Sequence, residues 1–289
     1  MTIAGVHIVT GAGRGIGRAL AMGLAARGAS GVALIDLTAP ESAAAATRSC
    51  AASSSFTALA IAADISTRTG VLTAVESART AFGGRIDGII SNAGVAPLAD
   101  PHGPLTSIGE SPEVWEQSMA VNLMAHVWAA EATVPGFEQQ EGGGAFVSIV
   151  SAAGLLTQIG APSYSVSKAA ALAFSESLAV HHGDRGVRVH CVCPQAVATS
   201  LVGLSSEDPN AAMPEGALAG GASDGVLSPD AVATATLDAM ESGEFMVLPH
   251  AQVASYVQMK AAAPGKWIRG MRKLRDAIAA GKTPLVQAS

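Results

Sequence analysis

Short apolar segments alternate with helical segments along most of the chain, and this alternation restricts the fold more than any other feature. Most of the short segments are apolar at every position, which is typical of strands covered by helices on both faces. The predicted strands are residues 6–10, 31–36, 56–62, 88–91, 145–151, 187–193 and 245–248. Helical periodicity lies between them, at residues 16–27, 67–82, 113–134, 164–182 and 229–242.

Such alternation, with short connections, predicts right-handed crossovers and a parallel, doubly wound sheet of seven strands. The chain has 289 residues, 49% of them hydrophobic, enough to bury one large core. We therefore expect a single α/β domain over residues 1–250 and a helical extension over 251–289. Residues Leu201 to Leu227 are rich in Gly, Ala, Ser and Pro, and they predict a mobile substrate segment at about 200–227.

Charge is unevenly distributed along the chain. From Lys260 onward there are seven Lys and Arg residues and one acid, so this part carries +6 and the rest −12 of a total of −6. Trp267, Met271, Leu274 and Ile278 recur there at helical spacing and predict a basic amphipathic helix. We expect its apolar stripe, with Trp267 buried, to dock on the body or on a neighbouring subunit. Nucleic-acid binding is not favoured, because no aromatic-rich platform accompanies the basic helix.

The first residues contain neither a basic segment nor a long apolar one, and nowhere do about 18 apolar residues follow each other. The sequence therefore predicts neither secretion nor a membrane partner. Cys50, Cys191 and Cys193 form no CxxC pair, which fits core thiols in a reducing cytoplasm. No metal site is expected, because His181, His182 and His190 lack acids or cysteines at ligand spacing.

The stretch TGAGRGIG, residues 10–17, follows the first predicted strand and leads into a helix. Its glycines permit a tight turn, close approach of a pyrophosphate and close helix packing, and the helix N-terminus favours an anion. The spacing differs from the common GxGxxG. Asp36 ends the second strand 19 residues after Gly17, where a carboxylate can accept hydrogen bonds from adenosine ribose hydroxyls. Together these features predict a Rossmann-type dinucleotide-binding domain.

Further motifs follow in a fixed order, and with them the sequence resembles the short-chain dehydrogenase/reductase family between Thr10 and Thr199. After TGAGRGIG these motifs are DI at 64–65, NAG at 92–94, VN at 121–122, Ser151, YSVSK at 164–168 and PQAVAT at 194–199. The family usually has Pro-Gly where this chain has Pro194-Gln195. The backbone there loses the freedom of glycine, and a polar side chain can enter the substrate pocket.

The resemblance implies a nicotinamide cofactor. It places Asp64 and Ile65 around the adenine, the NAG motif along the cofactor groove, and Val197 and Thr199 at the nicotinamide carboxamide. The expected cofactor-binding residues are Gly11, Arg14, Gly15, Ile16, Gly17, Asp36, Leu37, Asp64, Ile65, Asn92, Ala93, Gly94, Tyr164, Lys168, Pro194, Val197 and Thr199.

Tyr164 and Lys168 are four residues apart, so on a helix they share one face. A free tyrosine has a pKa near ~10, and a neighbouring ammonium, helped by the nicotinamide charge, favours the phenolate. We therefore expect Tyr164 to be the general base and Ser151 to stabilise charge on the substrate oxygen. The resemblance gives Lys168 a second role on the nicotinamide ribose, and gives Asn122 the task of holding a water between Lys168 and solvent.

The candidate substrate residues are mostly small and apolar, which favours a hydrophobic secondary alcohol or its ketone. A basic tail over the pocket would instead favour an acidic or coenzyme A-linked substrate. The candidates are Val95, Ala96, Ser151, Leu155, Gln195, Ala196, Leu201, Val202, Leu204 and Met213.

Cofactor choice depends on two residues. Asp36 would repel the 2′-phosphate of NADP, whereas Arg14 could pair with it; we expect NAD to be preferred. The leading hypothesis is a cytoplasmic, homo-oligomeric (dimeric or tetrameric) NAD-dependent alcohol dehydrogenase. The alternatives are an NADPH-dependent ketoreductase and, from another class, a non-catalytic NAD(H)-binding regulator, which would not need Ser151, Tyr164 and Lys168 together.

Overall fold

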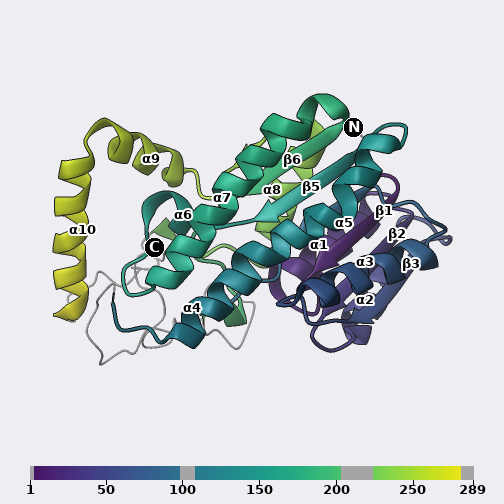
Figure 1. Ribbon diagram of the computed structural model, residues 1–289, viewed down its shortest axis with the longest axis horizontal. Coiled ribbons are helices and arrows are strands. Elements are labelled where there is room, and N and C mark those ends of the chain that lie inside the picture. Colours follow the sequence, from purple (N-terminus) through teal and green to yellow (C-terminus); the bar gives the residue numbers. More distant parts are fainter. Residues whose placement is uncertain (1–2, 98–107, 203–223, 281–289) are drawn as a thin grey trace.

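Seven parallel strands form the centre of the molecule in the computed structural model, which describes residues 3–97, 108–202 and 224–280. Figure 1 shows the sheet with helices on both faces. The strands are β1 (Val6–Thr10), β2 (Gly31–Asp36), β3 (Thr57–Ala62), β4 (Gly88–Ser91), β5 (Gly144–Ile149), β6 (Val187–Val192) and β7 (Met246–Val247). Their bounds agree with the sequence expectation within two residues.

The strand order is β3-β2-β1-β4-β5-β6-β7, so the winding direction reverses between β1 and β4. At such a reversal the helices on either side diverge and leave a crevice at the carboxyl ends of the strands. Val9 of β1 pairs with Leu34 of β2 and Ile90 of β4, and all three are fully buried. The predicted doubly wound Rossmann-type fold is confirmed.

Two helical layers cover the sheet. Leu20, Leu24 and Leu237 pack in the core on one face, and Val71 and Val75 belong to the core on the other. Burying each such side chain contributes about 1.5–3 kcal/mol. The first layer consists of α1 (Gly15–Ala26), α2 (Glu41–Ser49) and α8 (Pro229–Ser242), and the second of α3 (Arg68–Ala81), α5 (Ala125–Gln139) and α7 (Pro162–His182).

The helix expected at 113–134 is interrupted. It consists of α4 (Pro112–Met119), a wide π-helical turn at Ala120–Met124 and α5. The side chain of Asn122, inside the turn, bonds to the main chain of Val95, a long-range contact that periodicity does not report. Widened turns of this kind are frequent at functional sites.

Two helices have no counterpart in the sequence expectation, α2 and α6 (Ala152–Leu156), whereas α9 (Gln252–Ala262) lies within the helical extension expected over 251–289. Helix α2 is rich in alanine and α6 has one and a half turns, so neither shows a clear apolar period. The expected tail helix is present as α10 (Pro264–Ala279), and Figure 1 shows α9 and α10 at one end of the molecule, beside α6.

The expected mobile segment lies largely outside the described residues. On its near side is a short 3-10 turn, Ser200–Val202, and beyond it Leu227 bridges to Val197. Within the described ranges, no helix has the length and apolar character needed to cross a membrane.

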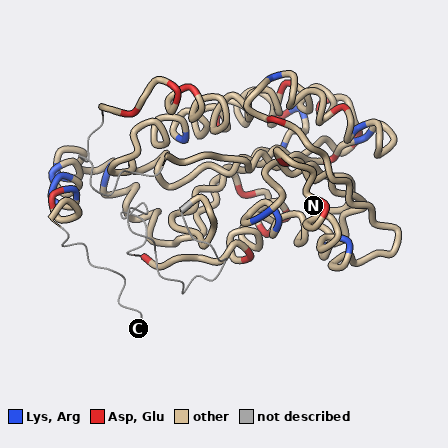
Figure 2. The backbone as a smooth tube through the Cα atoms, turned by 90° about the horizontal axis from the view of Figure 1, so that it is seen from below, with Lys and Arg blue, Asp and Glu red and all other residues tan. Residues whose placement is uncertain are grey.

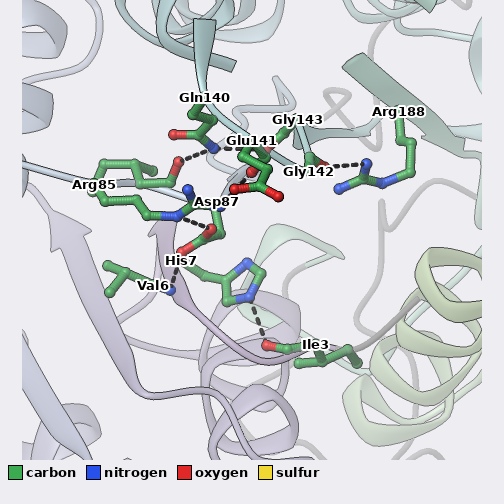
Figure 3. Close-up of polar contacts among 11 residues, drawn as sticks. Ile3, Val6, His7, Arg85, Asp87, Gln140, Glu141, Gly142, Gly143 and Arg188 are labelled. Atoms are coloured by element: carbon green, nitrogen blue, oxygen red, sulfur yellow. Dashed lines mark hydrogen bonds and ion pairs between the residues drawn. The ribbon is translucent and has the colours of Figure 1, made fainter. Parts of the chain in front are cut away.

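A polar cluster ties together the amino ends of the strands (Figure 3). The Asp87 carboxylate accepts the main-chain N–H of Val6 at 2.8 Å and the Nε–H of Arg85 at 2.7 Å. His7 Nε2 donates to the carbonyl of Ile3 at 2.8 Å, and Gln140 donates to the carbonyl of Ile86 at 2.9 Å. These bonds connect the first residues of the strands to the turns that precede them.

Candidate active site

The carboxyl ends of the strands open into a cavity of about 1260 Å³. Its wall includes the β1–α1 turn, the ends of β2, β4 and β5, helices α6 and α7, and the segment after β6. Helices α9 and α10 also contribute residues to it. The crevice expected from the strand order is thus present as a cavity at this end of the sheet.

The backbone of the glycine-rich turn has a shape that lets a ligand in the cavity approach it closely. Gly11 and Gly15 have φ of +62° and +54°, the left-handed region that glycine adopts without strain, and both line the cavity. Gly17 does not. A Cβ there would collide with the carbonyl oxygen of Gly11, so Gly17 lets α1 pack on the turn. The turn fits a bound pyrophosphate at the start of α1.

Asp36 stands at the end of β2 on the cavity wall. Its carboxylate accepts the N–H of Gly13 at 2.9 Å and that of Leu37 at 2.8 Å. These two bonds hold the acid between the glycine turn and the residue after β2. Arg14 and the exposed Leu37 line the same part of the cavity.

The NAG segment joins the ends of β1 and β4. Asn92 Nδ2 donates to the carbonyl of Thr10 at 2.8 Å, and the Thr10 hydroxyl accepts the N–H groups of Asn92 and Ala93 at 3.0 and 3.1 Å. Asn92, Ala93 and Gly94 line the cavity. The segment therefore supports the sheet where the crevice opens.

Tyr164, Lys168 and Ser151 meet on one wall of the cavity. Tyr164 and Lys168 lie on α7, both buried, with Lys168 Nζ 5.9 Å from the centre of the tyrosine ring and bonded to the carbonyl of Ile149 at 3.0 Å. Ser151 precedes α6 as its N-cap, and its Oγ accepts the N–H of Ala153 at 3.1 Å. A phenol, an ammonium and a hydroxyl therefore border one space.

Comparison with known proteins agrees with this geometry. The family described as short chain dehydrogenase matches residues 5–210. The chain is 32% identical over 207 residues to the CLA biosynthesis dehydrogenase/reductase of Lactiplantibacillus plantarum, covering 71% of this chain and 68% of that protein. It is 33% identical over 196 residues to the D-threitol dehydrogenase of Mycolicibacterium smegmatis, covering 68% and 71%.

Among solved structures, a short chain dehydrogenase/reductase from Burkholderia phymatum in complex with NAD matches with a TM-score of 0.72 and 26% identity, over 90% of this chain and 94% of that one. The chain belongs to the short-chain dehydrogenase/reductase family. It is an oxidoreductase with a Rossmann-type nucleotide-binding fold.

The electrostatics of this short-chain dehydrogenase differ from the sequence expectation at the tyrosine. Burial raises the pKa of Tyr164, and the hydrogen bond from Ser151 opposes that shift. Burial also lowers the pKa of Lys168 to about 8, against the raising effect of Cys193 and Cys191. Desolvation is therefore the largest effect of the protein on the pKa of the phenol.

Asn122 lies behind the cavity wall. Its Oδ1 accepts the N–H of Val95 at 2.9 Å, and its Nδ2 donates to the Val95 carbonyl at 2.9 Å and to the Ser167 hydroxyl at 3.1 Å. A Cβ on Gly94 would lie 3.3 Å from Asn122 Oδ1 and 3.4 Å from Lys168 Nζ. Asn122 thus holds the main chain of the segment at Gly94 and Val95, which passes close to Lys168. The water expected between Lys168 and solvent remains a prediction.

Apart from Gly17, every residue expected to bind the cofactor lines the cavity. Of the expected substrate residues, Leu155 does not line it and packs between α6 and α9. The side chain of Val202, together with Leu204 and Met213, lies outside the described residues. The other expected substrate residues line the cavity, namely Val95, Ala96, Ser151, Gln195, Ala196 and Leu201.

Gln195, which replaces the family's usual glycine, has a partner that the sequence did not reveal. Its main-chain N–H donates to Nδ1 of His250 at 3.1 Å. His250 is buried, and burial lowers its pKa, so the neutral imidazole keeps Nδ1 free to accept. The contact joins residues 55 apart in the chain, which explains why no local motif signals it.

Sequence reasoning raised a basic tail over the pocket only as an alternative and assigned no residue of α9 or α10 to the cavity wall. The apolar spacing of the tail was recognised, but the direction of the stripe depends on tertiary packing. Trp267, expected to be buried, is partly exposed, and its ring centre lies 6.3 Å from that of Tyr256. The wall residues here include Tyr256, Met259, Lys266, Trp267, Met271 and Leu274.

Metal ligation has no support in the described ranges, where no group of three or more His, Cys, Asp or Glu side chains is arranged to hold an ion.

Proposed function

We propose that this short-chain dehydrogenase/reductase is an NAD-dependent enzyme that interconverts a hydrophobic secondary alcohol and its ketone, with Tyr164 as general acid/base. The observation that carries the proposal is the convergence of Tyr164, Ser151 and Lys168 on a cavity that the glycine turn and Asp36 also line. A non-catalytic dinucleotide-binding regulator would not need these three side chains around one space.

Each residue has a distinct role in oxidation of the alcohol. The substrate hydroxyl gives its proton to Oη of the Tyr164 phenolate, which becomes the neutral phenol, while the Ser151 hydroxyl donates a hydrogen bond to the same substrate oxygen. The buried Lys168 supplies positive charge near the phenol and can hold ribose hydroxyls. The bound nicotinamide supplies the acceptor for the hydride that leaves the carbinol carbon.

The preference for NAD rests on Asp36. Its carboxylate can accept hydrogen bonds from free ribose hydroxyls but would face a doubly charged 2′-phosphate in NADP. Two like charges about 4 Å apart near a protein surface repel by several kcal/mol before screening. Even a residual difference of ~1.5–3 kcal/mol gives a preference of roughly ten- to a hundredfold.

Arg14 favours the second candidate, an NADPH-dependent ketoreductase. It lines the cavity beside Asp36 and could pair with a 2′-phosphate. Leu37, the residue after Asp36, adds no cation to support it.

We further propose a homo-oligomer in a reducing cytoplasm, in keeping with three free cysteines.

The decisive test is a panel of secondary alcohols and ketones assayed with both cofactors by nicotinamide absorbance. We expect turnover with NAD(H), a kcat/KM with NADP(H) that is at least tenfold lower, and a smaller difference between the two cofactors in Asp36→Ala. Equal values or a preference for NADP(H) would contradict the assignment of Asp36. Dinucleotide binding without turnover on any substrate would favour the regulator.

A further inference from the structure

The α9–α10 arm, residues 252–279, lies beyond the family match, which ends at residue 210. Helix α10 packs chiefly on α9 and has no fully buried residue. A helix with an apolar stripe and no core of its own requires a partner for that stripe.

Helix α9 is firmly attached to the catalytic domain. Val253 is fully buried beside Leu156 of α6, and Lys260 Nζ donates to the carbonyl of Leu155 at 2.5 Å. The Tyr256 hydroxyl donates to the Asp224 carboxylate at 2.9 Å. Since Ser151 is the N-cap of α6, the arm is anchored on the helix that directly follows a proposed catalytic group.

One face of the arm is part of the cavity wall. On α9 the lining residues Tyr256 and Met259 follow helical spacing, and on α10 Trp267, Met271 and Leu274 do the same. These side chains border the same cavity as Tyr164. The apolar stripe therefore continues from the reacting end of the cavity rather than forming a separate groove.

The other face of α10 is strongly basic. Figure 2 shows Lys and Arg gathered at this end of the molecule; the exposed members that do not line the cavity are Arg269, Arg272, Lys273 and Arg275. Asp276 is the single acid in the helix and pairs with Arg275 at 2.7 Å.

Lys266 is the one cation of the arm that lines the cavity. Its exposed side chain has no hydrogen bond or ion pair with any other described residue. The Asp224 carboxylate nearby in the lining already accepts a hydrogen bond from Tyr256. An anionic group of a ligand could therefore bind to the Lys266 ammonium, and the Lys and Arg side chains of α10 add positive electrostatic potential there.

We propose that the α9–α10 arm is the distal wall of the substrate site and selects an elongated aliphatic alcohol or ketone that carries a carboxylate at the end remote from the reacting carbon. The chain of the substrate lies along Trp267, Met271 and Leu274, and its carboxylate lies near Lys266. This assignment rests on the proposed redox function and names its substrate class.

The test compares kcat/KM for three ketones reduced with NADH: 2-butanone, 2-decanone and 9-oxodecanoate. The wild-type protein should prefer 2-decanone over 2-butanone by at least tenfold, and 9-oxodecanoate over 2-decanone by about fivefold or more. The first ratio reports the apolar wall and the second reports Lys266.

Two variants and a matched control separate these contributions. Met271→Asp should reduce the 2-decanone to 2-butanone ratio at least tenfold, and Lys266→Ala should remove the preference for the oxo acid. Lys273→Ala, on the outer face of the same helix, should keep both ratios within twofold of wild type. Because α10 has no fully buried residue, melting temperatures should stay close to wild type.

The outcomes distinguish the two proposals. Turnover of 2-butanone without a gain for longer ketones, or equal ratios in Met271→Asp and Lys273→Ala, would overturn the arm's role and leave the redox function intact. A change of mass in light scattering for Met271→Asp with unchanged ratios would show that a second copy covers the stripe instead. No turnover of any ketone with either cofactor would contradict both the proposed redox function and the proposed role of the arm.

Discussion

The polar side chains at the two ends of the sheet have different partners. At the amino end, the described polar groups largely bond to the protein itself: Asp87 to Val6 and Arg85, His7 to Ile3, and Gln140 to Ile86. At the carboxyl end, the tyrosine, lysine and serine border a cavity of about 1260 Å³. Parallel strands direct their carboxyl ends and the following helix N-termini to the same side, which makes that end suited to binding anions.

The comparison teaches that polar side chains in one fold divide into those that hold the sheet and those available to a ligand. Substitutions at the amino end should therefore change stability and leave catalysis per folded molecule intact. Substitutions at the carboxyl end should reduce catalysis and leave stability largely unchanged.

The largest effect is expected for Tyr164→Phe, which removes only the phenolic oxygen from the cavity wall. We expect a loss of about a thousandfold in kcat, typical for a general acid/base, with dinucleotide affinity and melting temperature retained. Steady-state kinetics, fluorescence titration with NADH and thermal unfolding measure these quantities. Lys168→Ala, by contrast, should weaken both turnover and dinucleotide binding. Near-normal turnover of the Phe variant would exclude Tyr164 as the proton-transfer group.

A smaller effect, on stability, is expected for Asp87→Ala at the opposite end. The change leaves the Val6 N–H and the Arg85 Nε–H without their acceptor, at a cost of about 2–3 kcal/mol in the free energy of unfolding. Urea denaturation should show this loss while kcat at 25 °C stays within twofold. Asp87→Asn should restore part of the stability because an amide oxygen can still accept from Val6. A drop in kcat without a loss of stability would contradict the division between the two ends.

The smallest effect concerns His126, buried behind the active site with Nδ1 3.3 Å from the Ser148 hydroxyl. Burial, assisted by the positive charge of Lys168, lowers its pKa to about 3. The unfolded chain binds a proton below pH ~6.5 and the folded protein does not, so stability is complete above that pH and falls as the pH decreases.

This single histidine should cost about 1.4 kcal/mol per pH unit between pH ~6 and 4. His126→Gln should make the free energy of unfolding less dependent on pH by that amount, as measured by urea denaturation at pH 7, 6 and 5. Glu138 pairs with the more exposed His182, and His182→Gln serves as a surface control. An identical pH slope in wild type and His126→Gln would show that His126 is protonated in the folded state.

Local sequence signals were sufficient for the fold and for much of the site. Strand periodicity, the glycine turn with Asp36, and the Tyr164–Lys168 spacing depend on residues close together in the chain, so their geometry follows from helix and strand repeats. Parallel order then brings Thr10, Asp36 and Ser91 to one edge of the sheet. For this reason nearly all residues expected at the cofactor site line a single cavity.

Contacts between distant segments decided the rest. Asn122 bonds to Val95 across 27 residues, Gln195 to His250 across 55, and Lys260 to Leu155 across 105. The amphipathic spacing of Trp267, Met271 and Leu274 determined that a stripe exists, but only the docking of α9 on α6 turned it toward the cavity. A helix pattern specifies which residues share a face, whereas the surface opposite that face depends on how the whole chain packs.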